Sequence, residues 1–187
     1  MKKTVVHETL LKVENLKTWF DTPEGTVRAV DGIDFDINPG ETLALLGESG
    51  CGKSISALSL LQLVPAPAGR IVSGRALLRD QDVLALSERD MRTIRGKRVA
   101  MIFQEPQTSL NPVLTVGEQI SEAIPQADGF FRQDKRVHVA ELLKAVGIAD
   151  AARRYDEYPF QLSGGMKQRV MIAMALATQP DLLIADE

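Results

Sequence analysis

The feature that constrains this chain most is a glycine-rich loop between an apolar stretch and a helical stretch. Residues 47–54 read Gly-Glu-Ser-Gly-Cys-Gly-Lys-Ser and match the pattern G-x-x-x-x-G-K-[ST]. Residues 41–46 before the loop read as an apolar strand of the kind buried on both faces of a parallel sheet. A helix is predicted from Lys53 to about Leu63, with Pro65 beyond its end. This order of elements predicts a phosphate-binding loop in an α/β protein.

The chemistry of this loop follows from its residue types. Glycines let the main chain wrap closely around a phosphate, and successive N–H groups of the loop and the helix start point at the anion. Lys53 would reach the β- and γ-phosphates of a nucleotide, and the Ser54 hydroxyl would coordinate Mg²⁺. A glycine-rich turn that merely caps a helix is the alternative reading, but the flanking strand and helix favour phosphate binding.

The C-terminal residues carry a pair of acids after another apolar strand. Residues 182–187 read Leu-Leu-Ile-Ala-Asp-Glu, which delivers two carboxylates to the sheet edge where α/β proteins bind ligands. Asp186 would hold Mg²⁺ through water, and Glu187 would orient and polarise an attacking water. Acidic residues often simply end a strand, so this pair alone does not indicate a functional site. Together with the phosphate loop upstream, it does.

A second glycine pair opens a helix at Ser163. The serine is explained as a helix cap, but Gly164 and Gly165 weaken a helix unless something approaches its backbone. Exposed amides and the positive end of the helix dipole would make this helix start another anion site.

The rest of the chain alternates strands with helices, which predicts an α/β fold with a helical insertion between Gln104 and Ser163. The other expected strands are residues 10–16, 26–30, 33–37, 76–79, 98–103 and 181–185. Further helices are expected from Ser87, over residues 116 to about 147, and from Ser163 to about 177.

Composition narrows the function classes. The 187 residues suit one domain of ordinary size, and a net charge of −3 gives no electrostatic reason to expect a nucleic-acid partner. The longest apolar run, residues 170–177, is far shorter than the roughly 20 residues that cross a bilayer.

Taken in this order, the motifs resemble the ATP-binding subunit of ABC transporters. Residues 47–54 resemble its Walker A loop, Gln104 its Q-loop and residues 162–168 its signature motif. Residues 182–186 resemble the Walker B strand, with Glu187 as the catalytic acid. Within that family, residues 101–112 are similar to subunits of dipeptide and oligopeptide importers.

The resemblance implies ATP and Mg²⁺ as ligands and assigns roles residue by residue. Phe20 would stack on adenine, with Trp19 as the neighbouring candidate; either could instead be a buried strand aromatic. The implied ATP contacts are Phe20, Gly47, Glu48, Ser49, Gly50, Cys51, Gly52, Lys53, Ser54 and Ile55. The implied signature contacts are Leu162, Ser163, Gly164, Gly165, Met166 and Gln168. Lys53, Gln104 and Glu187 would be catalytic, and Ser54, Gln104 and Asp186 would hold the metal.

The resemblance also implies an assembly. Two such subunits would form a head-to-tail dimer, identical or not, with each ATP on one subunit's Walker A loop and under the other's signature helix. The dimer would lie peripherally on the cytoplasmic face of the membrane, bound to two permease subunits and served indirectly by a solute-binding protein. The implied fold is a single P-loop NTPase domain, residues 1–187, with a parallel sheet, an N-terminal antiparallel β subdomain and a helical subdomain at about 105–161.

Two alternatives stay open beside peptide import. Soluble ABC ATPases of DNA repair or chromosome maintenance have long coiled-coil or zinc-bearing insertions, whereas only residues 105–162 separate Gln104 from Ser163 here. The second alternative is a nucleotide-binding module that does not hydrolyse ATP. An unrelated P-loop kinase would leave Ser163, Gly164 and Gly165 unexplained. The transported solute is not readable, because dipeptide, oligopeptide, glutathione and nickel systems share this type of subunit.

The family pattern continues beyond the Walker B acid, with a Pro-Thr turn, a Leu-Asp loop and a switch histidine that this sequence does not contain. We therefore expect a fragment, incomplete at the C-terminus, in which residues 44–46 and 183–185 are not hydrogen-bonded to each other. We also expect this chain alone to turn over ATP negligibly.

Overall fold

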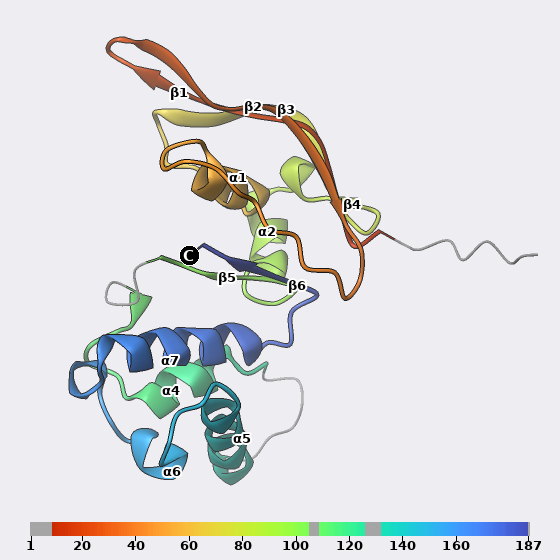
Figure 1. Ribbon diagram of the computed structural model, residues 1–187. Coiled ribbons are helices and arrows are strands. Elements are labelled where there is room, and N and C mark those ends of the chain that lie inside the picture. The colour runs from red at the N-terminus through yellow and green to blue at the C-terminus, as the bar shows by residue number, and fades with distance from the viewer. Residues whose placement is uncertain (1–8, 105–108, 126–131, 187) are drawn as a thin grey trace, which may run out of the picture. The chain divides into compact units, whose positions relative to one another are not determined.

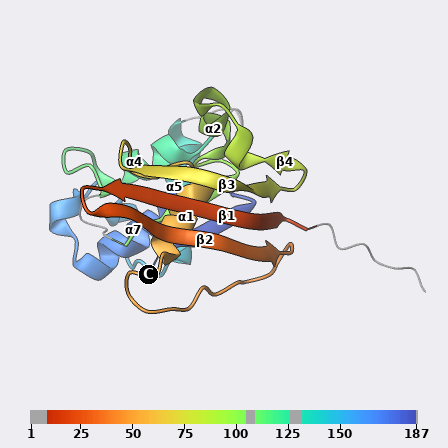
Figure 2. The same ribbon diagram turned by 90° about the horizontal axis from the view of Figure 1, so that it is seen from above.

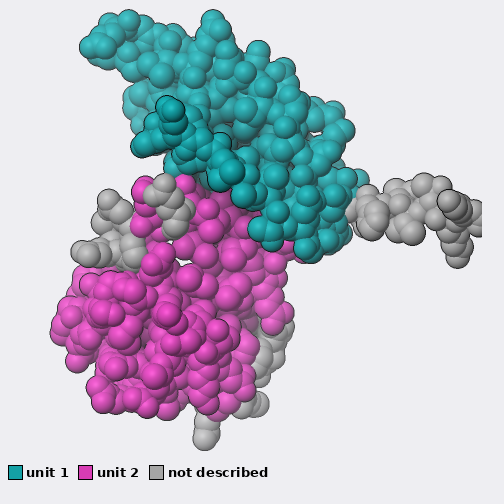
Figure 3. Space-filling view, in the orientation of Figure 1, with its two compact units in different colours: residues 1–92 teal, residues 93–187 magenta. Residues whose placement is uncertain are grey.

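The computed structural model describes residues 9–104, 109–125 and 132–186. These residues form two compact units, Met1–Arg92 and Thr93–Glu187, which Figure 3 colours separately.

The first unit is built on an antiparallel sheet. Its strands are β1 (Leu11–Thr22), β2 (Gly25–Ile37), β3 (Gly69–Leu78) and the short β4 (Gln81–Asp82), in the order β2-β1-β3-β4 (Figure 2). Leu11 and Val13 are buried and, after a shift in register, so are Leu16 and Thr18, while the residues between them are exposed or half-buried. This alternation is expected for a sheet with one covered face. The sheet is the N-terminal antiparallel β subdomain that the family resemblance implies.

Helix α1 (Lys53–Leu60) covers that buried face. The hydroxyls of Thr18 on β1 and Ser59 on α1 are buried and hydrogen-bonded at 2.8 Å, and the Ser59 hydroxyl is 2.6 Å from the Ile55 carbonyl oxygen. Because a buried hydroxyl without a partner is costly, this contact defines how α1 lies on β1.

Two short helical elements follow the sheet, the 3₁₀ turn η1 (Val83–Ala85) and helix α2 (Glu88–Ile94). The Asp90 amide donates to the Ser87 hydroxyl oxygen at 3.2 Å, so the helix start predicted at Ser87 is confirmed.

The second unit is a two-stranded parallel sheet and a set of helices. Strands β5 (Val99–Ile102) and β6 (Leu182–Ala185), both predicted as strands, pair in parallel. Its helical elements are α4 (Val116–Ala123), α5 (Arg132–Ala145), α6 (Ala151–Arg154), the 3₁₀ turn η3 (Pro159–Gln161) and α7 (Gly164–Leu176). Helix α7 lies between the strands and the pair α4 and α5 (Figure 1), and one apolar core joins these layers.

One predicted element is wrong. Residues 41–46 form no strand, and they are exposed; Leu46 is 92% exposed. A continuous apolar strand requires hydrogen-bonded neighbours in a parallel sheet, and no strand of the described residues pairs with this stretch. Strand β6 is paired with β5 alone among the described strands, and its Leu183 is exposed instead of buried on both faces.

Other differences concern element boundaries. The stretches predicted as two strands, residues 26–30 and 33–37, form the single strand β2. The strand predicted at 10–16 continues to Thr22, and α1 ends at Leu60, before the predicted end. The local sequence pattern predicts the position of these elements better than it predicts their ends. A strand stops where its pairing with a neighbouring strand stops, which the local pattern does not contain.

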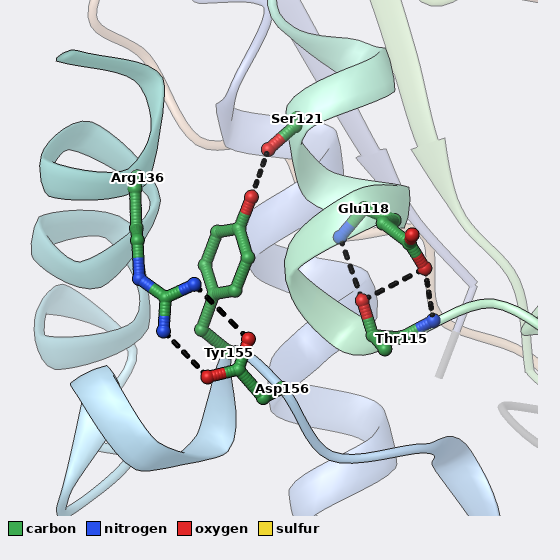
Figure 4. A network of polar contacts seen from close by, with 6 residues as sticks. All are labelled: Thr115, Glu118, Ser121, Arg136, Tyr155 and Asp156. Atoms are coloured by element: carbon green, nitrogen blue, oxygen red, sulfur yellow. Dashed lines mark hydrogen bonds and ion pairs between the residues drawn. The ribbon is translucent and has the colours of Figure 1, made fainter. Parts of the chain in front are cut away.

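A group of side chains that we call the tyrosine clasp joins the segment after α6 to α4 and α5 (Figure 4). It consists of the side chains of Ser121, Arg136, Tyr155 and Asp156, which Figure 4 labels, and of the backbone of Gly117. The Arg136 guanidinium lies 4.2 Å from the centroid of the Tyr155 ring and donates to both carboxylate oxygens of Asp156. These hydrogen bonds hold the pKa of the Asp156 carboxyl below its usual value. The Tyr155 hydroxyl is 3.3 Å from that of Ser121.

The main chain reinforces the clasp. The amides of Val116 and Gly117, at the start of α4, donate to the carbonyl oxygens of Glu157 and Tyr155, each at 2.8 Å. A Cβ at Gly117 would lie 2.3 Å from the Tyr155 ring, so only glycine lets the two segments approach this closely.

We predict that Gly117→Ala lowers the free energy of unfolding by about 1–3 kcal/mol, because the added methyl group overpacks against a ring held by Arg136. Gly165→Ala is the matched control, since a Cβ there meets nothing within 4 Å and alanine favours a helix. Urea unfolding followed by circular dichroism measures both. Equal losses in the two variants would contradict the prediction.

We also predict a pH-dependent contribution from Glu157. Its carboxylate accepts from Arg154 at 2.6 Å and from Arg153 at 3.2 Å, and the hydrogen bond from Arg154 is the main reason that its pKa is lowered. A folded-state pKa below the unfolded value of about 4.3 stabilises the fold above that value, and this stabilisation is lost as the pH falls through the folded pKa.

The measurement is the urea midpoint of the wild type and of Glu157→Gln at pH 7 and near pH 3. The two midpoints should differ at pH 7 and converge at the lower pH. Glu141→Gln is the control, because the Glu141 side chain is 69% exposed. A Glu157→Gln difference that stays constant with pH would count against this contribution.

Candidate phosphate site and signature helix

The glycine-rich loop turns tightly into α1. Gly50 and Gly52 have φ values of 81° and 96°, in the left-handed region that glycine adopts without strain. A Cβ at Gly52 would lie 2.2 Å from the carbonyl oxygen of Ala29 on β2. Position 52 therefore requires glycine for two independent reasons, and the loop backbone lies directly against the sheet.

Lys53 folds back over this loop. Its ammonium donates to the carbonyl oxygens of Gly47 and Glu48 at 2.8 and 2.9 Å and lies 3.8 Å from the sulfur of Cys51. Cys51 is exposed, and its sulfur is 2.5 Å from where a Gly47 Cβ would be. The positively charged Lys53 ammonium thus lies against the carbonyl groups of the loop, where a phosphate would bind.

The start of α1 is open to an anion. Its N-cap, Gly52, offers no side-chain hydrogen bond, and the first turn contains no acidic residue. The helix dipole places partial positive charge at this end, and no side chain of the first turn neutralises it. Ser54 and Ile55 lie in this turn, half-buried.

The two candidate adenine-stacking residues lie on opposite faces of β1. Phe20 shares a face with Thr18, and its Cε1 is 2.6 Å from where a Gly69 Cβ would be. Trp19 points the other way, with the Arg28 guanidinium 4.9 Å from its ring centroid. Because Thr18 contacts α1, Phe20 is the aromatic on the face of β1 that α1 covers.

The second unit brings two predicted site residues to one edge. Ile102 of β5 pairs with Ala185 of β6, and the Asp186 amide donates to the Ile102 carbonyl oxygen at 3.0 Å. Since the strands are parallel, Gln104 and Asp186 both follow their carboxyl ends. Glu187, the predicted catalytic acid, lies outside the described residues.

The described residues offer no ready-made metal cluster. Within residues 9–104, 109–125 and 132–186, no three His, Cys, Asp or Glu side chains lie close enough to hold an ion. The donors predicted for Mg²⁺ are a hydroxyl, an amide and one carboxylate, which are hard oxygen ligands of the kind that Mg²⁺ takes together with substrate phosphates.

The signature segment begins α7 as predicted. The Ser163 hydroxyl caps the helix by accepting from the Met166 amide at 3.4 Å, and the Lys167 amide donates to the Ser163 carbonyl at 3.0 Å. Leu162 is buried in the core, whereas Ser163 and Gln168 are exposed.

The glycine pair of this segment is exposed to solvent. Gly164 and Gly165 are exposed, and a Cβ at either would meet nothing within 4 Å of the described structure. Packing against the described residues therefore requires neither glycine, and a group from outside could approach both backbones.

The predicted residues therefore fall into two groups, one in each unit. The phosphate loop and Phe20 belong to the first unit; Gln104, Asp186 and the signature segment belong to the second. Prediction missed Ala29, Tyr155 and Arg169, because each acts through a contact with a distant segment that no local pattern reveals.

Comparison with known proteins agrees with this geometry. The family model for ABC transporters matches residues 30–187. The oligopeptide transport ATP-binding protein AppD of Bacillus subtilis is 52% identical over 179 residues, which cover 96% of this chain and 55% of AppD. The dipeptide transport ATP-binding protein DppD of the same organism is 48% identical over 180 residues, covering 96% and 54%. The chain thus spans about half the length of these relatives.

Solved structures show the same fold. A dimeric ATP-binding cassette, MJ0796, bound to ADP and Pi, superposes with a TM-score of 0.84 at 26% identity, covering 95% of this chain and 73% of that one. CbiO1 from Clostridium perfringens, part of an ABC transporter complex, gives 0.72 at 29% identity, covering 96% and 66%. The fold class predicted from the motifs, a P-loop ATPase core, is confirmed. By the family match and by these relatives, the chain belongs to the ABC transporter family.

Proposed function

We propose that this chain is the nucleotide-binding part of a subunit that binds and hydrolyses ATP to energise peptide import. The observation that carries the proposal is the loop itself, with Gly52 against Ala29 and an uncapped helix start behind Lys53. The names of AppD and DppD, oligopeptide and dipeptide transport ATP-binding proteins, support a peptide as the cargo class.

The loop fits a triphosphate. Main-chain amides from Gly47 to Ile55 would bind the phosphates, Lys53 would exchange its carbonyl partners for phosphate oxygens, and Phe20 would stack on the adenine ring. A charged phosphate competes well for Lys53, because charge-assisted hydrogen bonds are stronger than those to neutral carbonyls.

The strand edge supplies the hydrolytic groups. Ser54, Gln104 and Asp186 would hold Mg²⁺, which when bound neutralises charge on the phosphates. Glu187 would act as the general base toward the attacking water, and Gln104 would orient that water.

The signature segment would complete the site of a second subunit. The amides of Ser163, Gly164 and Gly165 would bind the nucleotide held by the partner's loop, which gives the open glycine pair a reason to be glycine. The dimeric state of MJ0796 supports this assembly. Only a bound nucleotide would join both halves, so hydrolysis would release them.

Partners and location follow from the same proposal. The assembled dimer would bind two permease subunits on the cytoplasmic face of the membrane, with a solute-binding protein as an indirect partner. Within the described residues, no helix has the length and apolar character to cross a bilayer. A single domain over residues 1–187 and a helical subdomain at 105–161 stay predictions. The transport names of the relatives do not favour a soluble DNA-repair ATPase.

We predict that Lys53→Ala weakens Mg-ATP binding about 10- to 100-fold, because a charge-assisted hydrogen bond contributes roughly 1.5–3 kcal/mol. Isothermal titration calorimetry on the chain measures the dissociation constant. Lys144→Ala, at an exposed position near the end of α5, is the control and should bind as the wild type does. Equal binding by Lys53→Ala and the wild type would refute the proposed nucleotide site.

Transport is tested separately in the cells that carry this gene. Replacing the Lys53 codon by alanine should abolish uptake of a labelled dipeptide or oligopeptide, while the Lys144 control keeps it. Loss of ATP binding without any loss of peptide uptake would overturn peptide import and leave the nucleotide site standing.

A further inference from the structure

Arg169 joins the signature helix to the end of another helix. It lies on α7 shortly after the signature segment, and its Nη1 donates to the carbonyl oxygens of Val146 and Gly147 at 2.8 and 3.1 Å. Both carbonyls belong to the residues that follow the last residue of α5, Ala145. One guanidinium nitrogen therefore binds two adjacent main-chain acceptors.

The chemistry of a helix end explains this contact. The last carbonyls of a helix lack partners within the helix and carry its negative dipole end, so a guanidinium there satisfies both the hydrogen bonds and the charge. The turn closes when the Gly147 amide donates to Lys144 O and the Ile148 amide to Leu143 O, at 2.9 Å each.

The Arg169 contact requires glycine at position 147. The φ of 77° at this position already favours glycine, and a Cβ there would lie 2.3 Å from the Arg169 Nη1. A side chain at position 147 would push the guanidinium off the carbonyls, so the two residues form one contact.

The signature segment is thus attached to α5 on both sides. Upstream, the tyrosine clasp binds Asp156 to Arg136 of α5. Downstream, Arg169 binds the end of the same helix. Between these attachments lies the capped turn at Ser163, where Gly164 and Gly165 are exposed and where a Cβ at either position would meet nothing within 4 Å in the described structure.

We propose that Arg169 is a positioning residue, which holds the first turns of α7 so that its amides meet the nucleotide of a second copy. This rests on the proposed function, because it assigns the signature segment to a partner's ATP. Arg169 is exposed and lies outside the apolar core of the second unit. Its removal should therefore act on assembly more than on stability.

The test compares Arg169→Met with Arg169→Lys, Gly147→Ala, the double variant Gly147→Ala/Arg169→Met and the control Arg92→Met. The Arg92 side chain is 77% exposed on α2. Sedimentation velocity with a non-hydrolysable ATP analogue measures dimer formation, and calorimetry measures the affinity of each chain's own loop. Amide hydrogen exchange at Met166 and Lys167, both held by Ser163, reports the first turn of α7 without nucleotide.

We expect Arg169→Met to weaken analogue-dependent dimerisation about tenfold, the size of one lost charged hydrogen bond. Its own-loop affinity should stay at the wild-type value, while exchange at Met166 and Lys167 accelerates. Arg169→Lys should recover part of the dimerisation, because it restores a charged donor. Gly147→Ala should weaken dimerisation similarly, and the double variant should be no weaker than either single variant.

The positioning role would be wrong if Arg169→Met dimerised as well as the wild type. It would also be wrong if the affinity of the variant's own loop for the analogue fell as much as its dimerisation. Either result would leave the proposed function standing. Failure of the wild type itself to bind the analogue would instead overturn the proposed function. In that case the exchange experiment still decides, because unchanged exchange in Arg169→Met would contradict the positioning of α7.

Discussion

The contact between Gly52 and the carbonyl oxygen of Ala29 is the constraint on which the phosphate loop depends. A side chain at position 52 would overlap that oxygen, so the loop reaches α1 only through glycine, in a left-handed conformation. Through this contact the loop packs against strand β2, and the hydrogen bond between Thr18 and Ser59 joins α1 to strand β1. The main chain, more than any side chain, therefore shapes the place where phosphates would bind.

In the second unit, the start of the signature helix must also be held in place. Its signature helix presents exposed amides at a capped, glycine-containing start, and an exposed turn of this kind has little packing to hold it. Attachments to α4 and α5 supply that support. Upstream, the Tyr155 ring lies against Gly117 of α4 and beside Arg136 of α5, and downstream Arg169 binds the carbonyls that follow α5. Both glycines in these contacts, Gly117 and Gly147, are required by what lies against them.

Sequence reasoning succeeded where the determinants are local. The helix starts at Ser87 and Ser163 were predicted because a capping hydroxyl acts on amides three residues away. The tight glycine turn into α1 was predicted because its pattern is contiguous, and its binding of phosphate stays a prediction. Residues 41–46 were predicted wrongly as a strand, because a strand exists only with a hydrogen-bonded neighbour, and that neighbour is not a local property. The contacts of Ala29, Tyr155 and Arg169 escaped prediction for the same reason.

The central claim is that main-chain amides between Gly50 and Ile55 bind the triphosphate, and amide chemical shifts test it most directly. In a ¹⁵N-labelled sample titrated with Mg-ATP to saturation, the amides of Gly50, Gly52, Lys53, Ser54 and Ile55 should shift most among those of the first unit. Saturation of binding with these five amides unmoved, and the largest shifts elsewhere in that unit, would contradict the account.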